Sequence, residues 1–173
     1  MNHDQQPFVP ADFVVPRTLV ADGFRLEPLG AEHNERDLAA WTGSIAHIRA
    51  TPGFVGRGWP PVAGMSAEAN LADLLRHAQE FEERVAFAYS LLEGEADGAG
   101  DGDGAGDGDG AGDGEVIGCL YIHGSRKVPG RVAVSHWVRS DRAALDARVH
   151  ERITRWLHEA WPFDAGRIDY APR

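Results

Sequence analysis

Three apolar runs in the second half of the chain have the pattern of strands. Residues 85–94 read VAFAYSLLEG, with Phe87, Tyr89 and Leu91 alternating against small residues. Residues 115–124, EVIGCLYIHG, form a β-rich apolar run, and residues 131–139, RVAVSHWVR, follow a Pro-Gly turn. Consecutive strands of this kind pair side by side, so the three runs predict an antiparallel meander.

The clearest helical pattern follows the third run. Apolar residues recur there at the 3.6-residue spacing of one helix face: Leu145, Val149, Ile153, Trp156, Leu157 and Ala160. Ser140 and Asp141 are the expected caps at the start of this helix, and Pro162 ends it. The stretch 166–171, GRIDYA, predicts a final short strand.

The first half of the chain has a similar pattern. Strands are expected at 17–20 and 24–29, because Ala-Asp-Gly between them is a hairpin signal. Helices are expected over 32–41 and after a Ser66 cap, where the apolar face comprises Leu71, Leu74, Leu75, Ala78 and Phe81. The order of elements predicts an α+β domain in which helices cover a mostly antiparallel, mixed sheet.

Residues 96–114 consist only of Asp, Gly and Ala and contain six of the 27 acidic residues. Without a large apolar side chain, the tract cannot offset the backbone entropy of its glycines, so we expect a disordered insertion at a hairpin tip. A calcium site is the alternative. However, the tract lacks the apolar residue of calcium-binding β-helix repeats, and it lacks the Glu and flanking helices of an EF-hand.

Composition narrows the class of protein further. No run of 18 apolar residues occurs, and the first ten residues lack the basic and apolar regions of a signal peptide. Cys119 is the single cysteine, and the eight histidines show no compact metal-ligand spacing. Mild acidity argues against nucleic-acid binding. These features predict one cytoplasmic domain over 1–173, without metal, nucleic-acid or membrane partners.

The order of elements, with the runs GFRLEPL, EVIGCLYI and VRSDRAALDARVHERITRWL, resembles the GNAT superfamily of N-acetyltransferases. Gly118 stands where the third strand of that family usually has glycine. The resemblance implies transfer of an acetyl group from acetyl-coenzyme A to an amine of a small molecule or protein. The family's last helix and strands have no counterpart here, which would leave a sheet edge for a homodimer to pair.

The resemblance also implies where coenzyme A would lie. A strand that feeds a helix N-terminus aims backbone N–H groups at a phosphate. The residues expected to hold the cofactor are Trp137, Val138, Arg139, Ser140, Arg142, Ala143 and Ala144. Ala144 and Asp146 stand where the family has glycines, and the Asp146 carboxylate would repel a pyrophosphate unless the two arginines offset it. In the alternative interpretation, Asp146 is a solvated acid in the first helical turn.

His136 is the expected general base, because its ordinary pKa is near neutrality. Its alternative role is that of a half-exposed strand histidine. Glu27 is a further acid–base candidate near the acceptor. Arg57 and Trp59, in the Gly/Pro-rich loop 50–65, and Tyr121 are expected to bind the substrate, with the loop packing over the sheet as a lid. The alternative function is a non-catalytic binding or assembly domain that has lost coenzyme A binding.

Overall fold

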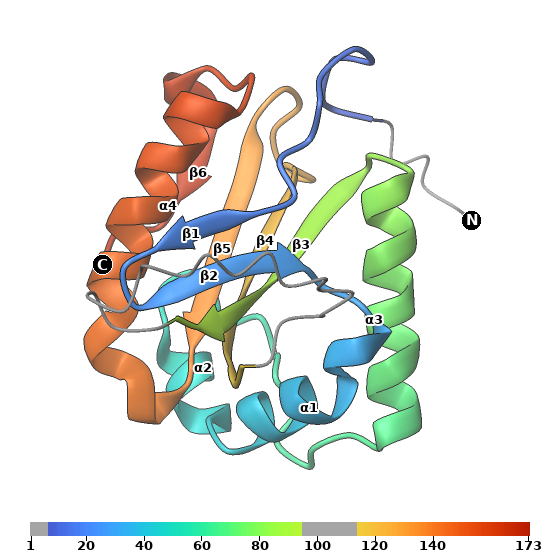
Figure 1. The fold of residues 1–173 in the computed structure, drawn as a ribbon, viewed down its shortest axis with the longest axis vertical. Coiled ribbons are helices and arrows are strands. Elements are labelled where there is room, and N and C mark those ends of the chain that lie inside the picture. Colours follow the sequence, from blue (N-terminus) through green and yellow to red (C-terminus); the bar gives the residue numbers. More distant parts are fainter. Residues whose placement is uncertain (1–6, 95–113) are drawn as a thin grey trace, which may run out of the picture.

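The computed structural model describes residues 7–94 and 114–173 (Figure 1). These residues form one six-stranded sheet in which the strands lie in chain order. The strands are β1 Leu19–Ala21, β2 Phe24–Pro28, β3 Ala86–Glu93, β4 Val116–Gly124, β5 Val132–Val138 and β6 Ile168–Tyr170. Neighbouring strands pair antiparallel from β1 to β5, whereas β5 and β6 pair parallel. The predicted α+β fold with a mixed sheet is confirmed.

Helices cover both faces of this sheet (Figure 1). The α-helices are α1 Asn34–Thr42, α2 Ile45–Ala50, α3 Ala67–Glu82 and α4 Asp146–Ala160. Short 3-10 turns lie at Ala31–His33, Ser140–Leu145 and Ala165–Arg167. The long α3 begins as the sequence predicts, since the backbone N–H of Ala69 donates to the Ser66 hydroxyl at 3.1 Å.

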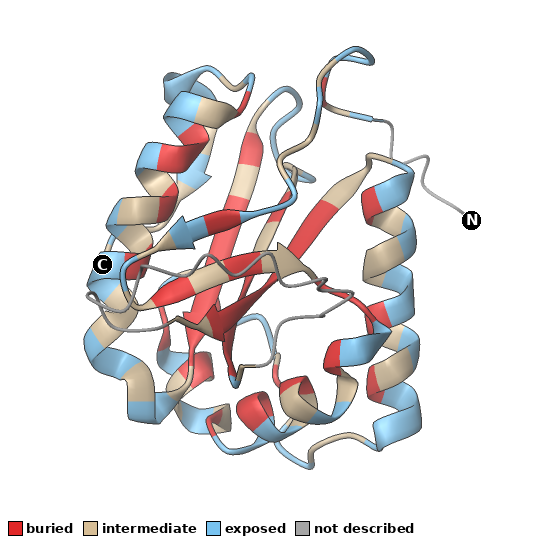
Figure 2. Ribbon diagram, viewed as in Figure 1, coloured by how far each residue is buried: buried red, intermediate tan, exposed pale blue. Residues whose placement is uncertain are grey.

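The alternation of side chains along the strands divides the core into two parts. Apolar residues of α4 pack with one set of strand residues, which includes Phe24, Tyr89 and Leu120. Helices α1, α2 and α3 pack on the other set, which includes Cys119 and Trp137. We refer to these as the α4 face and the α1–α3 face. Figure 2 shows that the central strands are buried along most of their length.

Two glycines are required by the geometry of the sheet. Gly23 has a φ of 87° in the β1–β2 turn, which confirms the hairpin predicted from Ala-Asp-Gly. Gly118 lies where a Cβ atom would collide with the carbonyl oxygen of Trp137 on β5. The glycine therefore lets β4 and β5 approach each other closely.

The structure corrects the predicted start of α4 and adds one helix. Ser140 and Asp141 do not cap α4, because residues 140–145 form a 3-10 turn and the α-helix starts only at Asp146. The Ser140 N–H instead donates to the Ser44 hydroxyl at 2.9 Å. The six-residue α2 was not predicted, because it is too short to show a periodic pattern. The predicted insertion 96–114 lies outside the described residues, except for Gly114.

Candidate functional site

The strand β5 places the predicted base and the predicted cofactor residues side by side. His136 pairs with Leu120 of β4 and lies on the α4 face, whereas Trp137 pairs with Cys119 and lies on the α1–α3 face. The side chain of His136 is completely buried, not half-exposed as a surface strand histidine would be. Its chemistry is therefore set by its protein neighbours.

Both ring nitrogens of His136 have close partners. Nε2 lies 2.6 Å from Oδ1 of Asp146, the first residue of α4, and Nδ1 lies 2.6 Å from the hydroxyl of Tyr170 on β6. The ring of His150 packs on Tyr170 with their centroids 4.2 Å apart. The site thus joins groups from β5, β6 and α4 in one hydrogen-bonded chain.

The pKa shifts of His136 and Asp146 assign the protons in this hydrogen-bonded network. Burial lowers the pKa of His136 to about 4 and outweighs the opposing hydrogen bond to Asp146, and Arg173 and His150 lower it further. Burial would raise the pKa of Asp146, but the His136 hydrogen bond and the Arg173 cation outweigh it and lower that pKa. At neutral pH, His136 is neutral and Asp146 is ionised. Nε2–H therefore donates to Asp146, and the Tyr170 hydroxyl donates to Nδ1.

Arg173 closes this network. Its Nε donates to Oδ2 of Asp146 at 2.7 Å, its Nη2 donates to the backbone carbonyl of His136 at 2.7 Å, and its Nη1 donates to the carbonyl of Pro52 at 3.1 Å. The side chain is only 5% exposed. We refer to Arg173 with these three acceptors as the arginine clasp.

The arrangement of Asp146 differs from both sequence interpretations. Its carboxylate is not a solvated acid on the first turn, because it faces the sheet and bonds to His136 and Arg173. Sequence reasoning gave no role to Tyr170 or Arg173 in the site. The predicted strand 166–171 was a signal that could have placed Tyr170 beside β5. No pattern in the sequence singled out Arg173.

The predicted cofactor residues after β5 lie close together but are already paired. Arg139 donates to Asp141 at 2.6 Å and to Glu115 at 3.0 Å, and Arg142 lies 2.8 Å from Glu93. Three carboxylates thus surround two guanidinium groups. A hollow of about 190 Å³ lies beside Arg139, between α1 and β4.

The other predicted cofactor residues differ in exposure. Trp137 and Val138 are buried within the two cores, so only their backbone atoms could meet a ligand. Ala143 and Ala144 are exposed on the 3-10 turn. The Ser140 N–H is occupied by Ser44, so it is not available to a phosphate in this arrangement.

Glu27 lies on the opposite face from His136. Cross-strand pairs place Glu27, Ser90 and Cys119 in one row on the α1–α3 face. The carboxylate of Glu27 lies 3.4 Å from both Arg25 and the buried His33. The two predicted catalytic residues are therefore separated by the sheet.

The predicted substrate residues partly converge. The ring of Trp59 packs against four other rings at centroid distances of 5.8 to 6.5 Å: Trp41, Phe54, Tyr121 and Trp137. The Gly/Pro-rich loop thus packs onto the α1–α3 face, as its aromatic residues predicted. Arg57 is exposed at the rim, with its guanidinium 5.6 Å from the centre of the Phe54 ring.

A buried carboxyl beneath this aromatic cluster was not predicted. Asp37 of α1 accepts hydrogen bonds from Cys119 at 3.3 Å and from Asn70 at 3.0 Å, and Trp41 donates to Asn70. Burial raises the pKa of Asp37 and that of the Cys119 thiol. Asp37 lies four residues before the apolar Trp41, so helical spacing could have placed it on the buried side. Cys119 has the inert, buried environment expected from its apolar strand.

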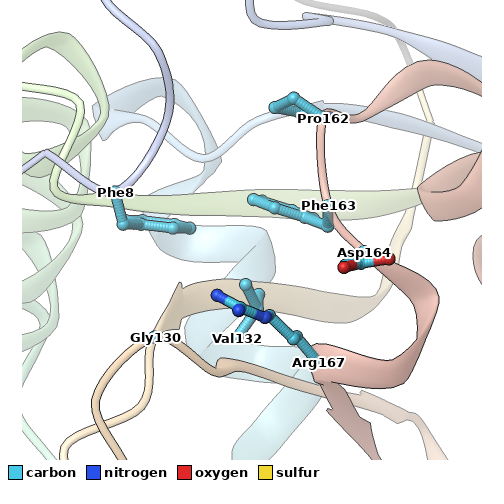
Figure 3. Close-up of a pocket in the computed structure, with 7 residues that line it drawn as sticks. All are labelled: Phe8, Gly130, Val132, Pro162, Phe163, Asp164 and Arg167. Carbon is cyan, nitrogen blue, oxygen red and sulfur yellow. The ribbon is translucent and has the colours of Figure 1, made fainter.

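A larger pocket lies away from these groups (Figure 3). It is an open hollow of about 600 Å³ where the rings of Phe8 and Phe163 lie near the side chain of Arg167. Its wall on β5 is Val132, four residues and roughly 13 Å along the strand from His136. None of the predicted site residues lines it. The groups able to transfer a proton therefore lie in the hydrogen-bonded network and not in this pocket.

The described ranges 7–94 and 114–173 contain neither a cluster of metal-ligating side chains nor a membrane-spanning helix. No group of three or more His, Cys, Asp or Glu side chains is arranged to hold a metal ion there. Within the same ranges, every helix is too short or too polar to cross a bilayer.

No protein-family model matches the sequence, and no curated protein does. Solved structures do match the fold. The microcin C7 self-immunity acetyltransferase MccE, solved with acetyl-CoA and AMP, matches with a TM-score of 0.56 and 12% identity over 90% of this chain and 72% of its own. The ribosomal-protein-S5-alanine acetyltransferase of Vibrio fischeri matches with a TM-score of 0.54 and 9% identity, over 83% and 68% of the two chains.

A GCN5-related N-acetyltransferase of Brucella melitensis is similar to the same extent. It matches with a TM-score of 0.55 and 15% identity over 86% of this chain and 58% of its own. At such identities the likeness concerns the fold and not the substrate. The chain therefore has the fold of the GNAT acetyltransferases.

Proposed function

We propose that the protein transfers an acetyl group from acetyl-coenzyme A to an amine of a small molecule or protein. The observation that carries the proposal is that β5 extends beyond its pairing with β6. Their pairing covers only Val132–Val134 of β5, and the strand then continues to Val138 without β6 beside it. The fold is shared with acetyltransferases, and one of these, MccE, was solved with acetyl-CoA.

The residues fit the extended arm of such a cofactor better than they fit its phosphates. The backbone edge of β5 at residues 136–138 would hold its extended arm, and residues 139–144 would meet its phosphates. There, the pairs of Arg139 with Asp141 and Glu115 oppose an anion. These two carboxylates are 54% and 60% exposed, however, so the pairs are weak and phosphate oxygens could replace them at little cost. When bound, the cofactor would supply the activated acetyl group; its carbon–sulfur bond would break as the amide bond forms, and coenzyme A would leave as the free thiol with the proton that the amine loses.

In this proposal, His136 is the base for the acceptor amine. The amine proton would bond to the Tyr170 hydroxyl oxygen as the original hydroxyl proton moves to Nδ1 of His136. The resulting imidazolium would lie against the ionised Asp146, 2.6 Å away. Glu27 has no direct part in this transfer, because it lies across the sheet. Trp59, Tyr121 and Arg57 lie on the same α1–α3 face as Glu27, so they would not contact an amine that reacts at Tyr170.

A non-catalytic binding or assembly domain is the second candidate. It is favoured by the pairing of Arg139 and Arg142 with three carboxylates and by the occupied Ser140 N–H. A phosphate has fewer free donors here than at an open helix N-terminus.

Calorimetric titration with acetyl-coenzyme A distinguishes the two candidates. We expect binding in the micromolar range, weakened about tenfold or more in the Arg139→Ala/Arg142→Ala double variant. Arg155→Gln is the matched control, because Arg155 lies exposed on α4 and pairs only with Glu151 in the described part of the chain. Release of free thiol in the presence of a panel of amines then tests transfer. Absence of binding at millimolar cofactor would reject the enzyme in favour of the binding domain.

A further inference from the structure

The arginine clasp lies just beyond the end of the pairing between β5 and β6. Register pairs of β5 and β6 end at Val134 and Tyr170, and two residues further along, the carbonyl of His136 accepts a hydrogen bond from Arg173. A buried carbonyl needs a donor, and at this point a guanidinium supplies it in place of a backbone N–H.

The clasp joins three separate parts of the fold. Its acceptors belong to β5, to the first turn of α4 and, through Pro52, to the loop that follows α2. The guanidinium is planar, and its donors form a fixed fork, so the three bonds hold these parts in one relative position. With 5% of the side chain exposed, water contributes little to its solvation.

We propose that the arginine clasp is a gate: Arg173 must leave the His136 carbonyl and the Asp146 carboxylate before the coenzyme A arm can bind along β5. The inference rests on the proposed function, because it assigns a regulatory step to the same groove. A ligand amide and the guanidinium would compete for the carbonyl of His136. The apparent affinity for the cofactor is then the intrinsic affinity multiplied by the fraction of molecules in which the clasp is open.

Opening of the clasp would also change the base. The charged and titratable groups that face the His136 imidazole are Asp146 and His150 on α4, Tyr170 on β6 and Arg173. Arg173 is the cation nearest to both His136 and Asp146 in this group. Its departure leaves the Asp146 carboxylate as the dominant charge, so the pKa of His136 rises. One movement would therefore admit the cofactor and strengthen the base.

The test compares Arg173→Gln and Arg173→Lys with the matched control Arg155→Gln. Calorimetry measures acetyl-coenzyme A binding, NMR titration of the ring protons measures the pKa of His136, and thermal melts show that each variant is folded. We expect Arg173→Gln to bind acetyl-coenzyme A at least tenfold tighter than the wild type and to raise the pKa of His136. Arg173→Lys keeps the charge without the fork, so its affinity should lie between the two.

The outcomes separate the gate from the proposed function. Equal binding by Arg173→Gln and the wild type, or weaker binding by the variant, would overturn the gate while leaving an acetyl-coenzyme A enzyme. If neither protein binds and the His136 pKa still rises in Arg173→Gln, the clasp controls the histidine but the proposed function, and the gate with it, is rejected. Binding by the variant alone would support both.

Discussion

Each face of the sheet holds a carboxyl group, and the pKa values of the two groups are shifted in opposite directions. On the α4 face, Asp146 contacts an imidazole and a guanidinium, and its pKa is lowered. On the α1–α3 face, Asp37 contacts an amide and a thiol, and burial raises its pKa. Burial acts to raise both pKa values, so the imidazole and guanidinium partners of Asp146, together with its partial exposure, account for the opposite direction of its shift.

The same contrast separates a packed core from a candidate reaction site. The α1–α3 face is dominated by aromatic rings in mutual contact, with Asp37 hydrogen-bonded to Asn70 and Cys119 beneath them. The α4 face combines apolar packing with a charged network at the end of β5. The contribution of the α1–α3 face to the free energy of unfolding is therefore expected to depend mostly on packing. The contribution of the α4 face is expected to depend on pH.

The largest effect is expected from Trp137→Ala, which tests the packing of the α1–α3 face. Trp137 is fully buried and contacts Trp59, so the truncation leaves a large cavity and should lower the free energy of unfolding by about 4 kcal/mol. Urea unfolding followed by circular dichroism measures this. Trp59→Ala is the comparison, since Trp59 is partly exposed and its loss should cost less. A larger cost for Trp59 would show that the loop, and not the strand, anchors this face.

The next effect is the pH dependence contributed by the α4 face. The pKa of His136 is about 4 in the folded protein against an ordinary value of 6.5, so the unfolded chain binds a proton first as pH falls. The contribution of His136 to the free energy of unfolding is therefore fully present above pH 6.5, and roughly 3 kcal/mol is lost as the pH is lowered to about 4. Asp37, with its raised pKa, contributes in the opposite direction, because its folded form takes up a proton first.

His136→Gln isolates the histidine contribution to this profile. Urea midpoints measured from pH 7.5 to 4 should change much less in this variant than in the wild type, whatever its absolute stability. A variant with the same slope as the wild type would mean that His136 does not remain neutral in the folded protein.

The smallest effect is expected when Asp146 and Asp37 are each replaced by asparagine. Asp146→Asn leaves the buried Arg173 cation without its carboxylate and should lower the free energy of unfolding by about 2 kcal/mol, less than for a fully buried pair because Asp146 is 23% exposed. Asp37→Asn removes no cation partner in the described part of the chain and should cost under about 1 kcal/mol. Equal costs, measured by urea unfolding, would contradict the conclusion that only Asp146 supports a buried cation in the described part of the chain.

Much of the fold follows from local patterns. The meander, the final strand and the capped start of α3 were predictable, because strand alternation and the Ser66 cap act within a few residues. The start of α4 was not, because Asp141 bonds to Arg139 instead of capping the helix. The 3-10 turn over Ser140–Leu145 delays the start of the α-helix, and a capping residue in the sequence does not reveal such a turn.

The site was predictable only where one residue carried its own signal. His136 was identified from its titration range and its place on β5. Its partners Asp146, Tyr170 and Arg173 lie 10 to 37 residues away along the chain. Their convergence depends on the parallel pairing of β5 with β6 and on the 3-10 turn before α4, which bring distant residues together. Such tertiary contacts leave no periodic trace in a single sequence.

The alternation along β5 has a consequence for how this chain can change in evolution. His136 and Trp137 are neighbours in sequence, yet one belongs to a charged network and the other to an aromatic core. Insertion or deletion of one residue in β5 would exchange them, placing an indole among charges and an imidazole among packed rings. Contacts on both faces of the sheet therefore constrain the register of this strand. Length variation among relatives should accumulate in the loops that surround it and spare the strand itself.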